Sequence, residues 1–146
     1  KEIDVKKFLH YIFYQLAGGL LAIGVIHFIF NNPPNYGLDI LQISTHEARS
    51  SSWALLVSEI IATSGLILTI LFVRKSDSES VATAVALFIT AGYWFTSSTS
   101  FANPMVTISR IFTDTFTGIS PSSVPYFLIG QFLGVLIAYL ICKKVK

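Results

Sequence analysis

Long uncharged stretches alternate with short charged segments along the 146-residue chain. Residues 8–30, 81–98 and 124–142 contain no Asp, Glu, Lys or Arg, and residues 53–73 contain one, Glu59. A helix rises 1.5 Å per residue, so about 20 residues cross the roughly 30 Å hydrocarbon core of a bilayer. The pattern therefore predicts four transmembrane helices over these ranges, of which 81–98 is just long enough.

A shorter apolar stretch lies between the third and fourth predicted spans. From Met105 on, apolar residues recur with helical spacing to near Gly118. Pro104 suits the first position of a helix, and Asn103 before it is a good N-cap. A helix over 104–117 is too short to cross the bilayer. It either lies flat in the membrane interface or enters the membrane and returns as a half-helix.

Two further patterns favour the re-entrant interpretation. The run Thr96–Ser100 is small and hydroxylated, which suits an extended segment whose backbone is satisfied by protein or pore water. A pattern in the first span also recurs in the fourth, 116 residues later, although coincidence among small and aliphatic residues would give a similar match. The matched pairs are Gln15 with Gln131, Gly18 with Gly134, Leu20 with Leu136 and Ala22 with Ala138.

A repeated helix in opposite orientation, together with a broken helix at membrane depth, is typical of transport proteins. We therefore expect an all-α membrane protein with four transmembrane helices and one re-entrant half-helix. Eight of the ten Lys and Arg residues fall in three clusters, at residues 1–7, 74–75 and 143–146. The positive-inside rule then places both termini and the 74–80 loop in the cytoplasm of a multi-pass protein of the cell's inner (plasma) membrane.

Composition narrows the class of protein further. Apolar residues make up 53% of the chain and charged residues only 12%, against about 25% charged in soluble domains. The scattered formal charge of +2 gives no reason to expect a nucleic-acid partner. One cysteine and three distant histidines predict no metal site and no cofactor. Because no nucleophile and base share a face at catalytic spacing, we do not expect an enzyme.

The order of polar residues in the spans resembles the second half of an aquaporin-type major intrinsic protein. The residues that carry this resemblance are Glu59 and Thr63 early in a span, Asn103-Pro104-Met105 before a short helix, and Tyr126, Gln131 and Gly134 in the closing span. By this resemblance, residues 1–30 are the last span of the first repeat, 31–52 are an outer connecting loop, and 53–146 are the second repeat.

Members of that family have six spans, two Asn-Pro-Ala half-helices that meet at the pore centre, and four monomers each with its own pore. The resemblance therefore implies the C-terminal two-thirds of an incomplete six-helix inverted-repeat fold. It also implies a homotetramer in the lipid bilayer, and missing N-terminal spans that would be needed to complete a pore.

The resemblance also assigns the site residues. Asn103, Pro104 and Met105 would form the pore motif, with helix N–H donors aimed at the passing solute. Val106 stands where the family usually has an Arg in its selectivity filter. Arg110, one turn further on, either substitutes for that Arg or reaches the outer surface. The other filter positions are the small residues Ser100, Ala91 and Gly92.

A wide filter of this kind is similar to that of aquaglyceroporin-like bacterial members, and the valine variant to channels for arsenic compounds. In the family the residue corresponding to Glu59 braces the re-entrant loop, and Gln15 and Gln131 are expected to brace it similarly. We therefore predict a passive channel for small uncharged solutes: water, glycerol-like polyols, or arsenite and related metalloid acids. The alternative is a non-conducting subunit or truncated fragment that packs with a partner, with the 104–117 helix lying flat.

Overall fold

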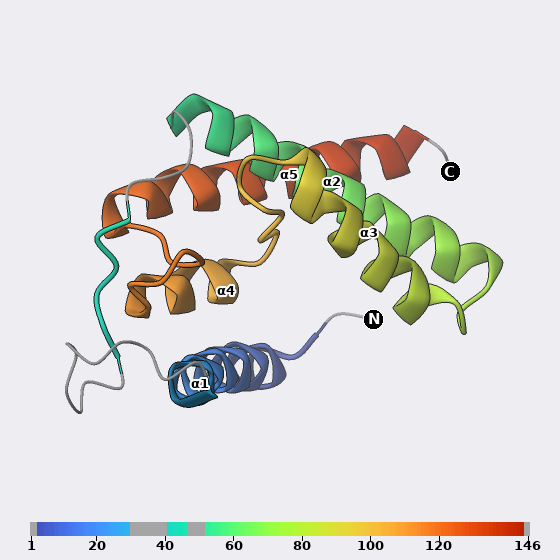
Figure 1. The fold of residues 1–146 in the computed structure, drawn as a ribbon. Helices are drawn as coiled ribbons and strands as arrows, with labels where there is room; N and C mark the ends of the chain where they lie inside the picture. Colours follow the sequence, from blue (N-terminus) through green and yellow to red (C-terminus); the bar gives the residue numbers. More distant parts are fainter. Residues whose placement is uncertain (1–2, 30–40, 47–51, 145–146) are drawn as a thin grey trace. The chain divides into compact units, whose positions relative to one another are not determined.

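The computed structural model describes residues 3–29, 41–46 and 52–144 (Figure 1). The chain forms two compact units. The first unit combines Lys1–Glu47 with Met105–Ser122, and the second combines Ala48–Pro104 with Ser123–Lys146. Every regular element among the described residues is helical. Each unit is therefore built from two separate stretches of sequence.

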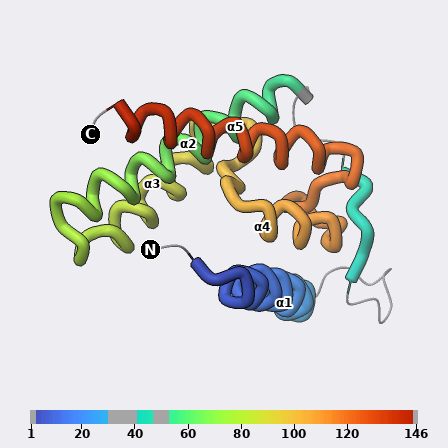
Figure 2. Tube along the Cα trace, turned by 180° about the vertical axis from the view of Figure 1, so that it is seen from behind, coloured from blue at the N-terminus to red at the C-terminus, as the bar shows by residue number. Residues whose placement is uncertain are grey.

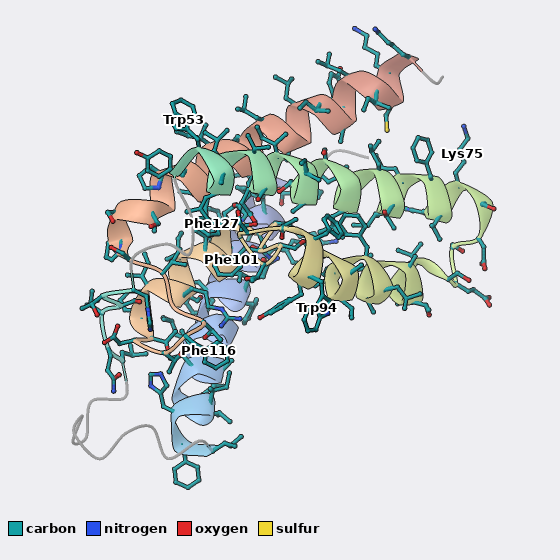
Figure 3. The ribbon with its side chains drawn as sticks, turned by 45° about the horizontal axis from the view of Figure 1, so that its top comes forward. Trp53, Lys75, Trp94, Phe101, Phe116 and Phe127 are labelled. Carbon is teal, nitrogen blue, oxygen red and sulfur yellow. The ribbon has the colours of Figure 1, made fainter. Side chains whose placement is uncertain are left out.

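The second unit consists of three apolar helices: α2 (Ser52–Ser76), α3 (Val81–Phe95) and α5 (Val124–Lys144). Helix α2 packs along α5 and also contacts α3, as the two opposite views in Figures 1 and 2 show. Trp53 and Lys75, labelled in Figure 3, lie near the two ends of α2. Arg74 and Lys75 occupy its last turn, where basic side chains are favourable next to the negative end of the helix dipole.

Glycines allow α5 to approach α2 closely. A Cβ added at Gly130 would lie 2.7 Å from the carbonyl oxygen of Leu56 and 2.8 Å from Cβ of Glu59. A Cβ added at Gly134 would lie 2.8 Å from Cβ of Thr63. All three distances are too short for a real methyl group, so the two helices approach each other closely at these glycines.

The first unit contains α1 (Val5–Ile29), most of α4 (Pro104–Ser109) and the 3₁₀ helix η1 (Arg110–Phe112). The segment 41–46 pairs with the chain that follows α4, because the backbone N–H of Gln42 donates to Phe112 O and that of Ser44 donates to Ile111 O, at 3.0 and 2.7 Å. A second 3₁₀ helix, η2 (Pro121–Ser123), leads into α5.

The short helix ends earlier than the expected 104–117. Its α-helical part stops at Ser109, η1 follows, and the backbone of Thr113 is extended (φ −136°, ψ 120°). Beyond Ser109 the sequence is rich in Thr, whose branched side chain disfavours helix. The carbonyl groups of Ile111 and Phe112 are also taken by the 41–46 segment instead of by a continuing helix.

Three of the four expected spans are long and apolar enough to cross a membrane: Val5–Ile29, Trp53–Ser76 and Pro121–Lys144. Helix α3 has 15 residues and a length of about 22 Å, and ends three residues before the expected end at 98. The backbone turns extended at Thr96, and the N–H of Ser97 donates to Ser58 Oγ on α2. Apart from residues 41–46, the expected outer loop before α2 lies outside the described residues, as do the two ends of the chain.

The exposed turn between α2 and α3 is held by Asp77. Its carboxyl group accepts hydrogen bonds from the Ser80 hydroxyl and from the backbone N–H of Glu79. These two bonds, that of Ser80 first, lower the pKa of Asp77 below its ordinary value. Because the folded pKa is depressed, the turn contributes stability above the unfolded pKa, and this contribution is lost as the pH falls through the folded value.

We expect Ser80→Ala to raise the pKa of Asp77 towards its ordinary value, because the largest cause of the shift is removed. A ¹³C titration of the Asp77 carboxyl carbon measures this, with Ser78→Ala as the matched control. An Asp77 titration midpoint that is the same in Ser80→Ala and the parent protein would show that the hydroxyl does not set the pKa.

Candidate functional site

The carboxyl group of Glu59 is the centre of the polar contacts in the second unit. Glu59 lies in α2, is completely buried, and accepts hydrogen bonds from the backbone N–H groups of Phe101 at 3.0 Å and Ala102 at 2.9 Å. The side-chain amide of Gln131 on α5 donates to the same group at 2.6 Å. One buried side chain therefore connects α2, α5 and the segment just before Asn103.

The segment that Glu59 contacts has an unusual backbone. Thr99, Ser100 and Ala102 have positive φ values of 57°, 54° and 46°. Residues other than glycine adopt this left-handed region at a cost of about 1–2 kcal/mol each. The two hydrogen bonds to Glu59 help to offset that cost, since hydrogen bonds to a charged or strongly polar side chain are among the more stabilising ones in proteins.

Aromatic and small residues pack the rest of this segment. The rings of Phe101 and Phe127, both labelled in Figure 3, have centroids 4.9 Å apart. Ser100 is buried against Gly92, where an added Cβ would lie 2.6 Å from Ser100 Oγ. That hydroxyl has no hydrogen-bond partner among the described residues. The structure thus brings together two of the expected filter residues, while Ala91 is exposed on α3.

The other two expected filter residues lie in the first unit. Val106 of α4 and Arg110 of η1 both line a cavity of about 180 Å³. Its walls come from α1 on one side and from the chain after Pro104 on the other. The complete lining is Gly19, Ala22, Ile23, Ile26, Val106, Ser109, Arg110, Thr113 and Thr117. The α1 wall is aliphatic, and the opposite wall carries hydroxyl groups and the Arg110 guanidinium.

Close packing of α1 against α4 shapes this cavity. Gly19 lies so close to Ser109 that an added Cβ would overlap the serine hydroxyl. The Ser109 hydroxyl instead donates to the carbonyl oxygen of Met105 at 2.8 Å, one turn back in α4. A small residue is therefore required at position 19 of α1.

The sequence did not indicate the series of polar contacts beside this cavity, which begins at His27. His27 is buried, with 8% of its surface exposed, and its Nε2 lies 2.7 Å from Thr113 Oγ1. Hydroxyl contacts of 3.0 Å continue from Thr113 to Thr115 and from Thr115 to Thr117. The alternation of Thr at 113, 115 and 117 was the available signal, because period-2 spacing predicts an extended segment with one hydroxyl face.

The remaining expected site residues occupy less enclosed positions. Asn103 and Met105 are half-buried on either side of the exposed Pro104, at the start of α4. Gln15 is exposed on α1, whereas its repeat counterpart Gln131 is buried. Within the described residues, no group of three His, Cys, Asp or Glu side chains could hold a metal ion.

The comparisons with known proteins agree with this architecture. Aquaglyceroporin AqpS of Rhizobium meliloti (strain 1021) is 42% identical to the chain over 129 residues, which are 88% of the chain and 52% of AqpS. The chain therefore spans about half the length of this relative. No protein-family model and no solved structure matches the chain.

Three long apolar helices and the likeness to AqpS define a multi-pass helical membrane protein. The chain belongs to the aquaporin, or major intrinsic protein, family, as its residue pattern indicated. The family is one of membrane channels and not of enzymes.

Proposed function

We propose that the chain forms part of a passive channel for small uncharged solutes, with Asn103, Pro104 and Met105 at the pore centre and Val106 at the filter. The observation that carries this proposal is the cavity in the first unit. Val106 and Arg110 share its lining, and the family pattern places both of them at or near the selectivity filter.

Glu59 supports the pore role of the motif. Its hydrogen bonds to Phe101 and Ala102 fix the two residues directly before Asn103. In the proposed re-entrant arrangement, the N–H groups at the start of α4 and the Asn103 side chain offer donors to the solute. Solute oxygens turn towards these donors, which interrupts a proton-conducting chain of waters, and the positive field opposes cations.

The proposed filter combines Val106 with Ser100, Ala91 and Gly92. All four side chains are small or aliphatic, and no fixed guanidinium stands at position 106. A filter of this composition is wider and less polar than one with an Arg. We infer that the permeant is larger than water, such as glycerol-like polyols, arsenite or another neutral metalloid acid.

The complete pore needs more than this chain. We propose that residues 1–30 form the last span of the first repeat and residues 53–146 the second repeat, joined by an outer loop at 31–52. N-terminal spans would supply the other half-helix, Gln15 would face them, and four copies would assemble as a homotetramer. Both ends of this chain would be cytoplasmic in the inner (plasma) membrane, in agreement with its basic clusters.

Stopped-flow measurements on liposomes that contain the full-length protein test this proposal. We expect glycerol flux above that of empty liposomes. If the full-length protein passes neither glycerol, water nor arsenite above the lipid background, the alternative of a non-conducting subunit is correct instead.

Val106→Arg is expected to lower glycerol flux about tenfold while water flux falls less, because a guanidinium narrows the passage and adds fixed donors. The same stopped-flow assay measures both fluxes. Val106→Leu is the matched control, because it enlarges the same side chain without adding a charge. Val135→Arg is not used, because it would place a charge on an exposed face of a membrane helix. If glycerol flux in Val106→Arg equals that of Val106→Leu, Val106 is not part of the filter.

A further inference from the structure

His27 is a buried titratable residue that the proposed pore role does not use. Its Nε2 contacts Thr113 Oγ1 at 2.7 Å, and hydroxyl contacts of 3.0 Å lead on through Thr115 to Thr117. Thr113 and Thr117 line the same cavity as Val106 and Arg110. An unbroken series of polar contacts therefore connects a buried imidazole to the wall of the candidate solute pathway.

The direction of this series depends on the imidazole. A hydroxyl group has one hydrogen to donate and can accept two hydrogen bonds, so the donor at each link is set by its neighbour. When an uncharged imidazole carries its hydrogen on Nδ1, its Nε2 accepts from Thr113. Thr115 then donates to Thr113 and Thr117 donates to Thr115, which leaves the oxygen of Thr117 available to the cavity as an acceptor.

Protonation reverses the first link and allows the others to reverse, because the hydrogen of Thr113 is released from the imidazole. A charged imidazole carries hydrogen on both nitrogens, so Nε2 donates to Thr113 Oγ1. Thr113 then donates to Thr115 and Thr115 to Thr117, and the hydrogen of Thr117 is free to point into the cavity. Thr117 then offers the cavity a donor and has one of its two acceptor positions occupied by Thr115, and hydrogen bonds in such a chain reinforce one another.

We propose that His27 is a positioning residue that sets, through Thr113 and Thr115, whether Thr117 accepts from or donates to a hydroxyl-bearing solute in this cavity. The proposal rests on the proposed function, because it takes the cavity as part of the solute pathway. Arg110 also lines the cavity, and a guanidinium carries donors and no acceptor. The state with an acceptor at Thr117 therefore suits a polyol better, since the hydroxyl hydrogens of the solute need acceptors.

Within the described part of the chain, the segments that contact His27 or its threonine partners carry Arg110, Asp114 and His46 as charged or titratable groups. Asp114 Oδ1 accepts from the backbone N–H and the hydroxyl of Thr45, at 2.7 and 3.0 Å. His46 is an exposed histidine, so it needs its own control.

Glycerol flux into liposomes that contain the full-length protein, measured from pH 5 to 8, tests the proposal. We expect flux to be about threefold or more lower at the acid end, the factor that corresponds to one lost neutral hydrogen bond. His27→Gln and Thr115→Val should both conduct with flux independent of pH. His46→Gln should keep the parent pH profile.

A flat profile in a conducting parent protein would overturn the proposal, and so would a parent-like profile in His27→Gln or Thr115→Val.

Absence of flux at every pH would contradict the proposed function instead. In that case the ¹⁵N resonance of His27 Nε2, measured in lipid, tests whether the threonines are connected to the imidazole. Thr113→Val should shift it strongly and Thr115→Val should shift it less. Coincidence of the Thr115→Val and parent resonances would show that the chain of contacts does not reach the imidazole.

Discussion

Glu59→Ala is expected to reduce solute flux through the full-length protein to the level of empty liposomes. The variant removes the acceptor of two part-buried backbone N–H groups, at Phe101 and Ala102, and of the buried Gln131 amide. Each buried donor left without a partner costs about 1–3 kcal/mol. The left-handed residues Thr99, Ser100 and Ala102 then have fewer stabilising hydrogen bonds nearby. We therefore expect the Asn103-Pro104-Met105 motif to lose its position.

Stopped-flow glycerol uptake measures this effect, and amide hydrogen exchange at Phe101 and Ala102 reports its cause. Glu59→Gln should be intermediate, because an amide offers one acceptor oxygen where a carboxyl group offers two. Glu79→Ala removes an exposed acidic side chain of the α2–α3 turn and is the matched control. Normal flux in Glu59→Ala, with unchanged exchange at both amides, would contradict the role we assign to Glu59.

Gly134→Val is expected to separate α5 from α2 and to destabilise the protein strongly. The first added carbon would already lie 2.8 Å from Cβ of Thr63 and 2.9 Å from the carbonyl oxygen of Ile60. Neither of these atoms is the end of a flexible side chain, so the helices themselves must move. Overpacking of this kind costs about 1–3 kcal/mol, and helix separation would also strain the bond from Gln131 to Glu59.

The temperature of thermal unfolding in detergent measures this loss. Val135→Ile enlarges an exposed neighbour on the same helix and should leave that temperature nearly unchanged. The unfolding temperature of Gly134→Ala should lie between those of Gly134→Val and Val135→Ile. If Gly134→Val unfolds at the same temperature as Val135→Ile, α5 does not contact α2 through this glycine.

The membrane helices could be predicted because a long uncharged stretch has few stable alternatives in a bilayer. The apolar helices of the structure and the likeness to AqpS confirm the all-helical class and the family. Glu59 was noticeable for a related reason, since a lone acidic residue inside a span is costly unless it has partners. The local pattern did not predict that its partners are backbone groups 42 and 43 residues away. Only the resemblance predicted a contact with that segment.

The ends of α3 and α4 could not be placed from local pattern, because residues distant in sequence decide them. Ser58 of α2 accepts the backbone N–H of Ser97 beyond α3, and the 41–46 segment takes the carbonyl groups of Ile111 and Phe112 beyond α4. The burial of His27 could not be predicted for the same reason. Its partner Thr113 is 86 residues away, and nothing near His27 in the sequence indicates that contact.

Chemical modification of a cysteine placed at position 106 tests most directly that solute passes Val106. The full-length protein carries Val106→Cys in a background where Cys142 and any other cysteines are serine. A small methanethiosulfonate reagent should block glycerol flux, and excess glycerol should slow the reaction. Val135→Cys, on an exposed face of α5, should keep its flux after labelling. Full labelling of Val106→Cys with undiminished glycerol flux would contradict a solute pathway along this residue.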